Sequence, residues 1–179
     1  VDPTLLFRQA FSPNFFLLAL EEPGPIEEIL NADIEASLRY FHRGNAAGSI
    51  AFASTEYEFF DEIARGVDPG GALLHRDDEF AHYVRAFVRT GFDASLAILR
   101  PISENHRDER ARRETLDLPM AFFLGGKDGQ LPKERLEGYC PRELFPRAEL
   151  FVFEDAGHFP HLEAPDAVNE TLLDFIKRI

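Results

Sequence analysis

The feature that most constrains the fold is an uninterrupted apolar segment in the last third of the chain. Residues 118–124 read Leu-Pro-Met-Ala-Phe-Phe-Leu, and a pair of glycines follows them. A strand buried on both faces of a parallel sheet has this composition. Residues 148–153, Ala-Glu-Leu-Phe-Val-Phe, form a second segment of this kind and lead into Glu-Asp-Ala-Gly. We therefore predict two parallel strands, each ending at a loop that contains glycine.

A helical segment follows each predicted strand. Residues 136–144 are weakly helical, and a helix near Pro165 carries an apolar stripe. The members of that stripe are Val168, Leu172, Phe175, Ile176 and Ile179. The order strand, helix, strand, helix is typical of an α/β protein with a doubly wound parallel sheet. Two strands cannot cover their own faces and edges, so we expect a partner segment to complete the sheet.

The first two thirds of the chain are instead predicted to be helical. Apolar residues recur at helical spacing, and glycine or proline interrupts them, as at residues 23–25. Asp33 is placed to cap one helix and Gly91 to end another. The charged run 107–114 mixes both signs and indicates a solvated helix face. We place the boundary between residues 1–115, which are helical, and residues 116–179, which form the βαβα region.

Composition and charge exclude several classes of partner. The 179 residues include 19 Lys and Arg against 32 Asp and Glu, a net charge of −13. Such an acidic chain is not expected to bind nucleic acid or an anionic membrane surface. No apolar run approaches the roughly 20 residues of a membrane helix, and a single cysteine cannot form an internal disulfide. We expect a cytoplasmic protein that needs no cofactor, and the histidines show no spacing typical of a metal site.

Two side chains that could carry chemistry follow the ends of the predicted strands. Asp128 comes just after the first strand, and His158 comes just after the second. The carboxyl ends of adjacent parallel strands meet at one edge of a sheet, so these side chains should lie within hydrogen-bonding reach. A carboxylate that accepts from a histidine prepares it to act as a general base. A turn-forming aspartate and a solvated histidine are the plainer interpretations of the same residues.

A third candidate, His161, is interpreted as a neighbour of the site rather than as the base. Gly157 directly precedes His158 and allows it a close approach to the site, whereas nothing does so for His161.

These loops resemble those of a known family. Residues 118–128, with Gly-Gly-Lys-Asp at their end, look like the acid loop of α/β hydrolases, and residues 157–165, Gly-His-Phe-Pro-His-Leu-Glu-Ala-Pro, look like the histidine loop. Residues 21–28, Glu-Glu-Pro-Gly-Pro-Ile-Glu-Glu, and the segment from Ala86 to Arg100 look like cap-domain signatures of the epoxide-hydrolase branch. The resemblance covers nearly the whole chain.

The resemblance implies a fold class and a division of labour. Residues 1–115 would be a helical cap domain with a flanking helix, and residues 116–179 the C-terminal βαβα part of an α/β-hydrolase core. In the family a nucleophile attacks the substrate to give a covalent ester. The histidine that matches His158, oriented by the acid that matches Asp128, then activates water to cleave the ester.

The nucleophile itself has no counterpart in this sequence. No Gly-x-Ser-x-Gly or Gly-x-Asp-x-Gly elbow precedes the cap signatures. Three explanations are open: a fragment of a longer protein, one product of proteolytic processing, or a natural half-protein that forms a heterodimer. In each case we expect the N-terminal half of the hydrolase fold to be the partner that carries the nucleophile.

The cap also departs from the epoxide-hydrolase pattern at its two tyrosine positions. These are Phe16 and Leu99, and neither side chain can donate a hydrogen bond to an epoxide oxygen. Tyr40, Tyr57 or His42 could substitute, although no spacing favours any of them. The absence of tryptophan disfavours a haloalkane dehalogenase.

Apolar residues at these and nearby positions predict the character of the substrate pocket. We predict an apolar pocket formed by Phe16, Leu99, Phe92 and Phe159, and therefore a small to medium, apolar substrate. A plain role in the cap core is the alternative for the cap residues.

Three functions remain in competition. The leading hypothesis is an epoxide-hydrolase-like enzyme in which this chain supplies the base, ranked narrowly above an ester or lactone hydrolase of the same fold. The second is a pseudoenzyme that binds a ligand or serves assembly, which the retained acid–histidine pair argues against. The third and weakest is an independent structural domain.

Overall fold

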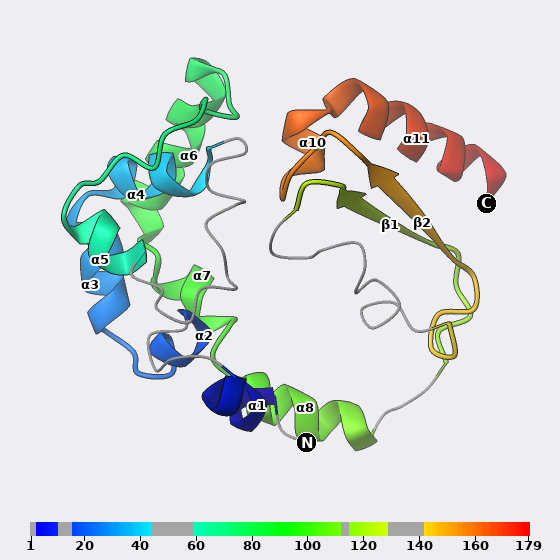
Figure 1. Cartoon of the computed structure of the whole chain (residues 1–179), viewed down its shortest axis with the longest axis horizontal. Coiled ribbons are helices and arrows are strands. Elements are labelled where there is room, and N and C mark those ends of the chain that lie inside the picture. The colour runs from blue at the N-terminus through cyan, green and yellow to red at the C-terminus, as the bar shows by residue number, and fades with distance from the viewer. Residues whose placement is uncertain (1–2, 11–15, 44–58, 112–114, 129–141) are drawn as a thin grey trace. The chain divides into compact units, whose positions relative to one another are not determined.

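The computed structural model describes residues 3–10, 16–43, 59–111, 115–128 and 142–179. These residues separate into two compact units, a helical one within residues 3–111 and one with strands within residues 115–179 (Figure 1). The assignment of the units as a cap domain and part of a hydrolase core stays a prediction. In the described ranges, no helix combines the length and the apolarity needed to cross a bilayer.

Eight helices are described in the first unit, as the sequence pattern predicts for this region. They are α1 (Pro3–Ala10), α2 (Phe16–Ala19), α3 (Pro25–Ala32), α4 (Ile34–Phe41), α5 (Phe59–Ala64), α6 (Asp77–Thr90), α7 (Asp93–Ala97) and α8 (Ile102–Ala111). The expected caps are confirmed at two of them. The Asp33 carboxylate accepts from the backbone N–H of Ala36 at 2.9 Å and caps α4. The backbone N–H of Gly91 closes α6 on the carbonyl of Phe87.

The core of the helical unit forms where α3 packs against α4 and α5, and where α4 packs against α6. Its most deeply buried apolar side chains are Leu20, Leu30, Leu38 and Phe80. Tyr40 is also buried, and its hydroxyl donates to the carboxylate of Glu62. Burial and this bond to Glu62 raise the pKa of Tyr40 above its usual value.

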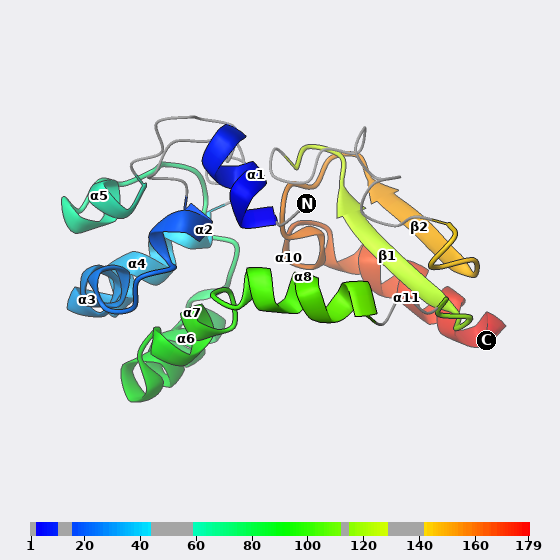
Figure 2. The ribbon, with the colours of Figure 1, turned by 90° about the horizontal axis from the view of Figure 1, so that it is seen from below.

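The second unit contains two parallel strands and two helices. Strand β1 (Met120–Gly125) pairs with β2 (Ala148–Phe153) in a register that joins Met120 to Ala148 and Gly125 to Phe153. Helices α10 (Pro160–Glu163) and α11 (Pro165–Arg178) follow β2, and α11 runs along one face of the strands (Figure 2). The predicted second strand is confirmed residue for residue, and the first begins two residues later than predicted.

One predicted helix of this unit is not found where it can be tested. The prediction covered residues 136–144, of which 136–141 lie outside the described residues, and residues 142–144 form a turn.

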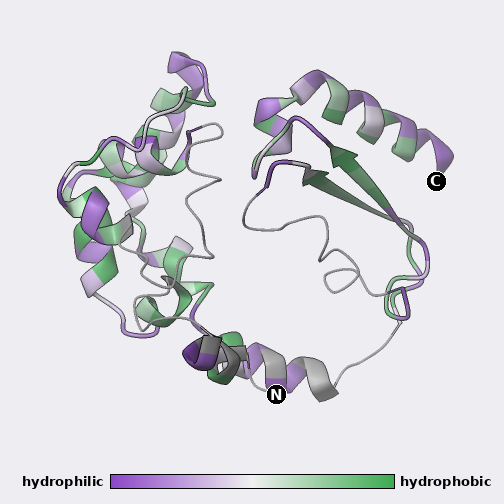
Figure 3. Cartoon of the chain, in the orientation of Figure 1, coloured by the Kyte–Doolittle hydropathy of each residue, from purple (hydrophilic) through white to green (hydrophobic). Residues whose placement is uncertain are grey.

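The expected burial of the strands on both faces is not found within the described chain. Phe123 and Phe151 stack at 5.4 Å, and Phe151 meets Phe175 of α11 edge-on, so this face has a partner. On the other face, Leu150 is 42% exposed. The strands are largely hydrophobic, with Glu149 as the exception (Figure 3), yet their residues are mostly half-buried because α11 covers only one side.

The predicted apolar stripe of α11 is likewise only partly buried. Val168 and Phe175 are buried, whereas Leu172, Ile176 and Ile179 are exposed. Within the described residues α11 packs against β1 and α10, and this leaves the three side chains exposed.

Candidate active site

The loops that follow the two strands are joined by backbone hydrogen bonds. Past the end of β1, the N–H of Gly126 donates to the carbonyl of Phe153 at 2.8 Å, and that of Lys127 donates to Ala156 at 2.9 Å. Strand pairing therefore continues beyond both strands, and the residues that follow are held side by side. This is the edge of a parallel sheet at which α/β proteins place their sites.

Glycine is required at this junction because the two loops approach each other closely. A Cβ atom at Gly125 would lie 1.8 Å from the carbonyl oxygen of Gly157, and one at Gly126 would lie 2.6 Å from Cα of Glu154. Both neighbours are backbone atoms that cannot rotate away. The Gly-Gly pair read from the sequence thus lets the acid loop lie directly against the histidine loop.

The structure brings Asp128 and His158 together as the strand order predicts. Nδ1 of His158 lies 2.9 Å from Oδ2 of Asp128. Asp128 is 5% exposed, whereas the His158 side chain is 29% exposed. An imidazole that donates from Nδ1 to a carboxylate has its lone pair on Nε2. The pair therefore combines a buried carboxylate with an imidazole that is partly exposed.

A further carboxylate, Glu163 of α10, holds the backbone around the histidine. It accepts from the N–H of Gly157 at 2.9 Å and from that of Phe159 at 3.1 Å, so both neighbours of His158 are anchored. Sequence reasoning missed this residue. Its signal was a glutamate in the short helical segment that Pro160 begins, but only the folded chain shows which N–H groups it reaches.

The surroundings of the pair are apolar on one side and charged on the outside. The Phe159 ring meets the His158 ring edge-on at 5.0 Å. Outside the pair, Lys127 and Asp155 form an exposed ion pair, and the hydrogen bond and charge of Lys127 lower the pKa of Asp155. These two charged side chains are exposed to water, whereas the hydrogen bond between Asp128 and His158 is partly buried.

His161 lies beside this arrangement rather than in it. It is exposed on α10, and its ring lies 6.2 Å from that of Phe159. The hydrogen bond to Asp128 is made by His158.

The predicted pocket residues of the helical unit have different environments. Phe92 is buried and packs on Phe87, with ring centroids 4.7 Å apart, as a plain core role would require. Leu99 lies just after α7 and is partly exposed. Phe16 is the first residue of α2, and its side chain lies outside the described ones. A shared pocket of these residues with Phe159 stays a prediction.

The structure limits the side chains that could replace the cap tyrosines as hydrogen-bond donors. The hydroxyl of Tyr40 is buried and already donates to Glu62, which argues against this substitute. Nδ1 of His42 lies 2.6 Å from Nε2 of His75, and burial, followed by the charge of His75, lowers the pKa of His42 to about 4. Tyr57 lies outside the described residues. Among the residues described, no group of three or more His, Cys, Asp or Glu side chains could hold a metal ion.

Comparison with known proteins places this arrangement in a family. The sequence pattern of the alpha/beta hydrolase family matches residues 10–171. The chain belongs to this family. The predicted resemblance to the epoxide-hydrolase branch is also confirmed, because epoxide hydrolases are found among both the curated relatives and the solved structures that match.

Two curated relatives illustrate the extent of the similarity. Epoxide hydrolase A of Mycobacterium tuberculosis is 29% identical over 185 residues, which cover 98% of this chain and 56% of the relative. Bifunctional epoxide hydrolase 2 of Rattus norvegicus is 23% identical over 167 residues, which cover 90% of this chain and 29% of the relative. The chain thus spans about half the length of the first relative and under a third of the second.

Solved structures confirm the predicted fold class. Epoxide hydrolase A from Mycobacterium thermoresistibile has a TM-score of 0.78 at 24% identity, covering 99% of this chain and 57% of its own. A variant of Vigna radiata epoxide hydrolase has a TM-score of 0.80 at 22% identity, covering 100% and 58%. The two strands and their helices are therefore part of an α/β-hydrolase fold.

Proposed function

We propose that this chain supplies the general base of an epoxide-hydrolase-like enzyme whose nucleophile lies outside it. His158 would activate the water that cleaves a covalent ester, and Asp128 would orient the imidazole. The observation that carries the proposal is the 2.9 Å hydrogen bond between Nδ1 of His158 and the buried carboxylate of Asp128, at the ends of two parallel strands. The match to the hydrolase family over residues 10–171 supports it.

The proposed step uses both nitrogens of the imidazole. Nε2 of His158 removes a proton from water as the oxygen attacks the ester carbonyl. The proton on Nδ1 stays there and remains hydrogen-bonded to the carboxylate of Asp128. The negative charge of this carboxylate stabilises the imidazolium that forms. The tetrahedral intermediate then collapses, the carbon–oxygen bond to the product breaks, and the leaving oxygen takes up the proton. The nucleophile is restored, and the proton taken by His158 is returned.

The nucleophile is proposed to come from the N-terminal half of the fold, either covalently linked or as a separate chain. The half-exposed face of the strands, with Leu150 at 42% exposure, offers this segment an apolar surface to cover. The same division is supported by the coverage of 56% of Epoxide hydrolase A of Mycobacterium tuberculosis and of 57% and 58% of the two solved structures.

The proposed substrate is small to medium and apolar, bound by Phe16, Leu99, Phe92 and Phe159. A second candidate function, hydrolysis of an ester or lactone, is favoured by one observation. The tyrosine positions are occupied by Phe16 and Leu99, and Tyr40 is committed to Glu62. Ring opening produces an alkoxide that needs hydrogen-bond donors, whereas acyl transfer does not depend on donors from the cap.

The test uses this chain produced together with its upstream segment, assayed on an aryl epoxide and on a p-nitrophenyl ester. We expect turnover, and we expect His158→Ala to abolish it while a covalent adduct accumulates in the intact mass of the nucleophile-bearing segment. His161→Ala, the matched control on the same loop, should retain turnover.

Three other results have distinct meanings. Undiminished turnover in His158→Ala would overturn the proposal. Ester turnover without epoxide turnover would select the acyl hydrolase. Binding of the epoxide without any turnover would show a pseudoenzyme and would also overturn the proposal.

A further inference from the structure

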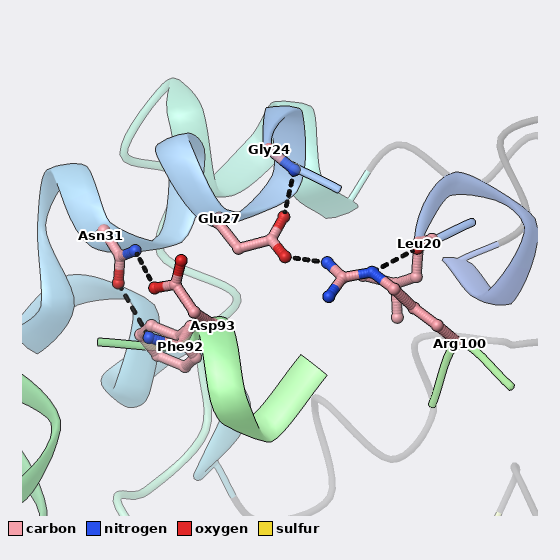
Figure 4. Close-up of polar contacts among 7 residues, drawn as sticks. All are labelled: Leu20, Gly24, Glu27, Asn31, Phe92, Asp93 and Arg100. Atoms are coloured by element: carbon pink, nitrogen blue, oxygen red, sulfur yellow. Dashed lines mark hydrogen bonds and ion pairs between the residues drawn. The ribbon is translucent and has the colours of Figure 1, made fainter. Parts of the chain in front are cut away.

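The helical unit contains a second buried carboxylate, at the start of α3 (Figure 4). Glu27 is 5% exposed, and its Oε2 accepts from the backbone N–H of Gly24 at 2.9 Å. A glutamate at this position caps the first turn of its own helix. Its other oxygen, Oε1, forms an ion pair with Arg100. Glu27 therefore joins α3 to a residue that lies far along the chain, after α7.

Arg100 makes a second connection that reaches α2. Its Nε donates to the backbone carbonyl of Leu20 at 2.9 Å, and Leu20 directly follows the last residue of α2. The Arg100 side chain is 19% exposed, so both bonds are largely shielded from water. One guanidinium therefore holds three elements: the end of α2, the first turn of α3 and the segment after α7.

Asn31, one turn further along α3, fixes the other end of α7. Its Oδ1 accepts from the backbone N–H of Phe92 at 2.9 Å, and its Nδ2 donates to Asp93 at 3.1 Å. Residues four apart lie on one face of a helix. The face of α3 that carries Glu27 and Asn31 thus holds α7 at both ends. The earlier residue, Glu27, holds the later end, so α7 runs antiparallel to α3.

We propose that Arg100 and Glu27 are positioning residues that set the substrate selectivity of the pocket, an inference that rests on the proposed function. Leu99 is the direct neighbour of Arg100, and Phe16 begins the single turn of helix whose end Arg100 binds. Phe16 and Leu99 occupy the two tyrosine positions of the epoxide-hydrolase pattern, which lie far apart in sequence, and both are among the residues predicted to form the pocket. The ion pair fixes the spacing between them without touching the substrate.

The chemistry of the arginine explains why this position needs it. The guanidinium is a planar fork that binds two acceptors at once, here the Glu27 carboxylate and the Leu20 carbonyl. A lysine has a single ammonium and cannot span both acceptors in this geometry. Arg100→Lys therefore keeps the charge and releases one of the two connections.

The exposed pair of Glu35 and Arg39 on α4 offers a matched control. It has the same two residue types four apart in sequence, but both side chains are about half exposed. Arg39→Lys changes the same chemical group without loosening α2 or the segment after α7.

The experiment compares Arg100→Lys, Glu27→Gln and Arg39→Lys in the hydrolase produced with its upstream segment. The first readout is the ratio of kcat/KM for the two enantiomers of an aryl epoxide, or for a short and a long p-nitrophenyl ester. This ratio does not depend on how much of the enzyme is folded. We expect it to change about fivefold or more in Arg100→Lys and Glu27→Gln, and to stay within twofold in Arg39→Lys.

The second readout does not require turnover. Hydrogen exchange measured by mass spectrometry should increase together in α2 and in residues 98–102 of Arg100→Lys, and should be unchanged there in Arg39→Lys. Unchanged exchange in α2 would overturn the inference even if the protein were inactive. An unchanged selectivity ratio in an enzyme that His158→Ala inactivates would also overturn it while leaving the proposed function intact.

Discussion

The two units of this chain each bury one carboxylate against one cationic or basic partner, and they use it differently. Glu27 and Asp128 are both 5% exposed. In the helical unit the partner is the guanidinium of Arg100, a fork of donors that can bind several acceptors at once. In the strand unit the partner is the imidazole of His158, the side-chain type most often used in general acid–base catalysis. The same acid group is therefore a structural anchor in one unit and a proposed part of the chemistry in the other.

Access to water differs in the same direction. The Glu27 side chain is 7% exposed and that of Arg100 is 19% exposed, and their bonds cap α3 and join it to the end of α2 and to the segment after α7. In the other pair the acid is enclosed, but the imidazole is partly exposed beside Phe159. The comparison teaches that burial of a carboxylate does not mark a catalytic site by itself. The chemical type of the partner, a guanidinium in one pair and an imidazole in the other, distinguishes the two.

The largest expected effect tests the chemical side of this comparison. Asp128→Asn should lower kcat by about 10⁴-fold in the hydrolase produced with its upstream segment, because an amide no longer selects the tautomer that leaves Nε2 free. Single-turnover kinetics, with circular dichroism to confirm the fold, would measure this. A loss of less than tenfold would mean that Asp128 is a structural acid like Glu27.

The second effect tests the structural side. Glu27→Ala should reduce the free energy of unfolding by about 3–5 kcal/mol, since it leaves the charge of Arg100 enclosed without its partner. Urea unfolding monitored by circular dichroism is the measurement. Glu35→Ala, which breaks the exposed pair with Arg39, serves as the control and should cost less than about 1 kcal/mol. Equal losses in the two variants would remove the distinction between anchored and exposed pairs.

The smallest effect concerns a histidine whose partner is not a carboxylate. His42 faces His75, and its pKa in the folded chain is lowered to about 4 from 6.5. The unfolded chain therefore takes up this proton first as the pH falls. The associated stability is present above pH 6.5 and is lost between pH 6.5 and 4. After a reduction for the partial exposure of the ring, the expected loss in the free energy of unfolding is about 2 kcal/mol.

Urea unfolding at several pH values would measure this slope. In His42→Gln the fall over this interval should be largely absent, whereas His82→Gln, at an exposed position of α6, should retain it. A slope that persists in His42→Gln would assign the proton uptake to another group.

Much of the local structure could be predicted from the sequence. The strand over residues 148–153 is confirmed in full, and so are the cap at Asp33 and the end of α6 at Gly91. These features depend on neighbouring residues, whose spacing is visible in the chain. The juxtaposition of Asp128 and His158 also followed, because both lie at the ends of strands that the pattern made parallel neighbours.

Other features could not be predicted, because they depend on contacts that no residue pattern marks. Glu163 was overlooked because the groups that donate to it are backbone N–H groups, which are not specific to any residue type. The burial of β1 and β2 on both faces was wrong for the described chain, since burial depends on what covers a strand as well as on its own residues. The pairing of Glu27 with Arg100 could not be predicted because the two residues belong to separate cap-domain motifs, and only the folded chain brings these motifs into contact.

The sequence by itself determined the elements, the order of the acid and the histidine, and the family to which the chain belongs. Periodicity, turn residues and loop motifs are local properties, so they can be read before folding. The tertiary structure alone decided the partners of several other polar groups: Glu163 for the N–H groups beside His158, Glu62 for Tyr40 and Arg100 for Glu27. An acidic chain offers many carboxylates of equal chemical type, and only packing selects which of them lie within bonding distance of a given donor.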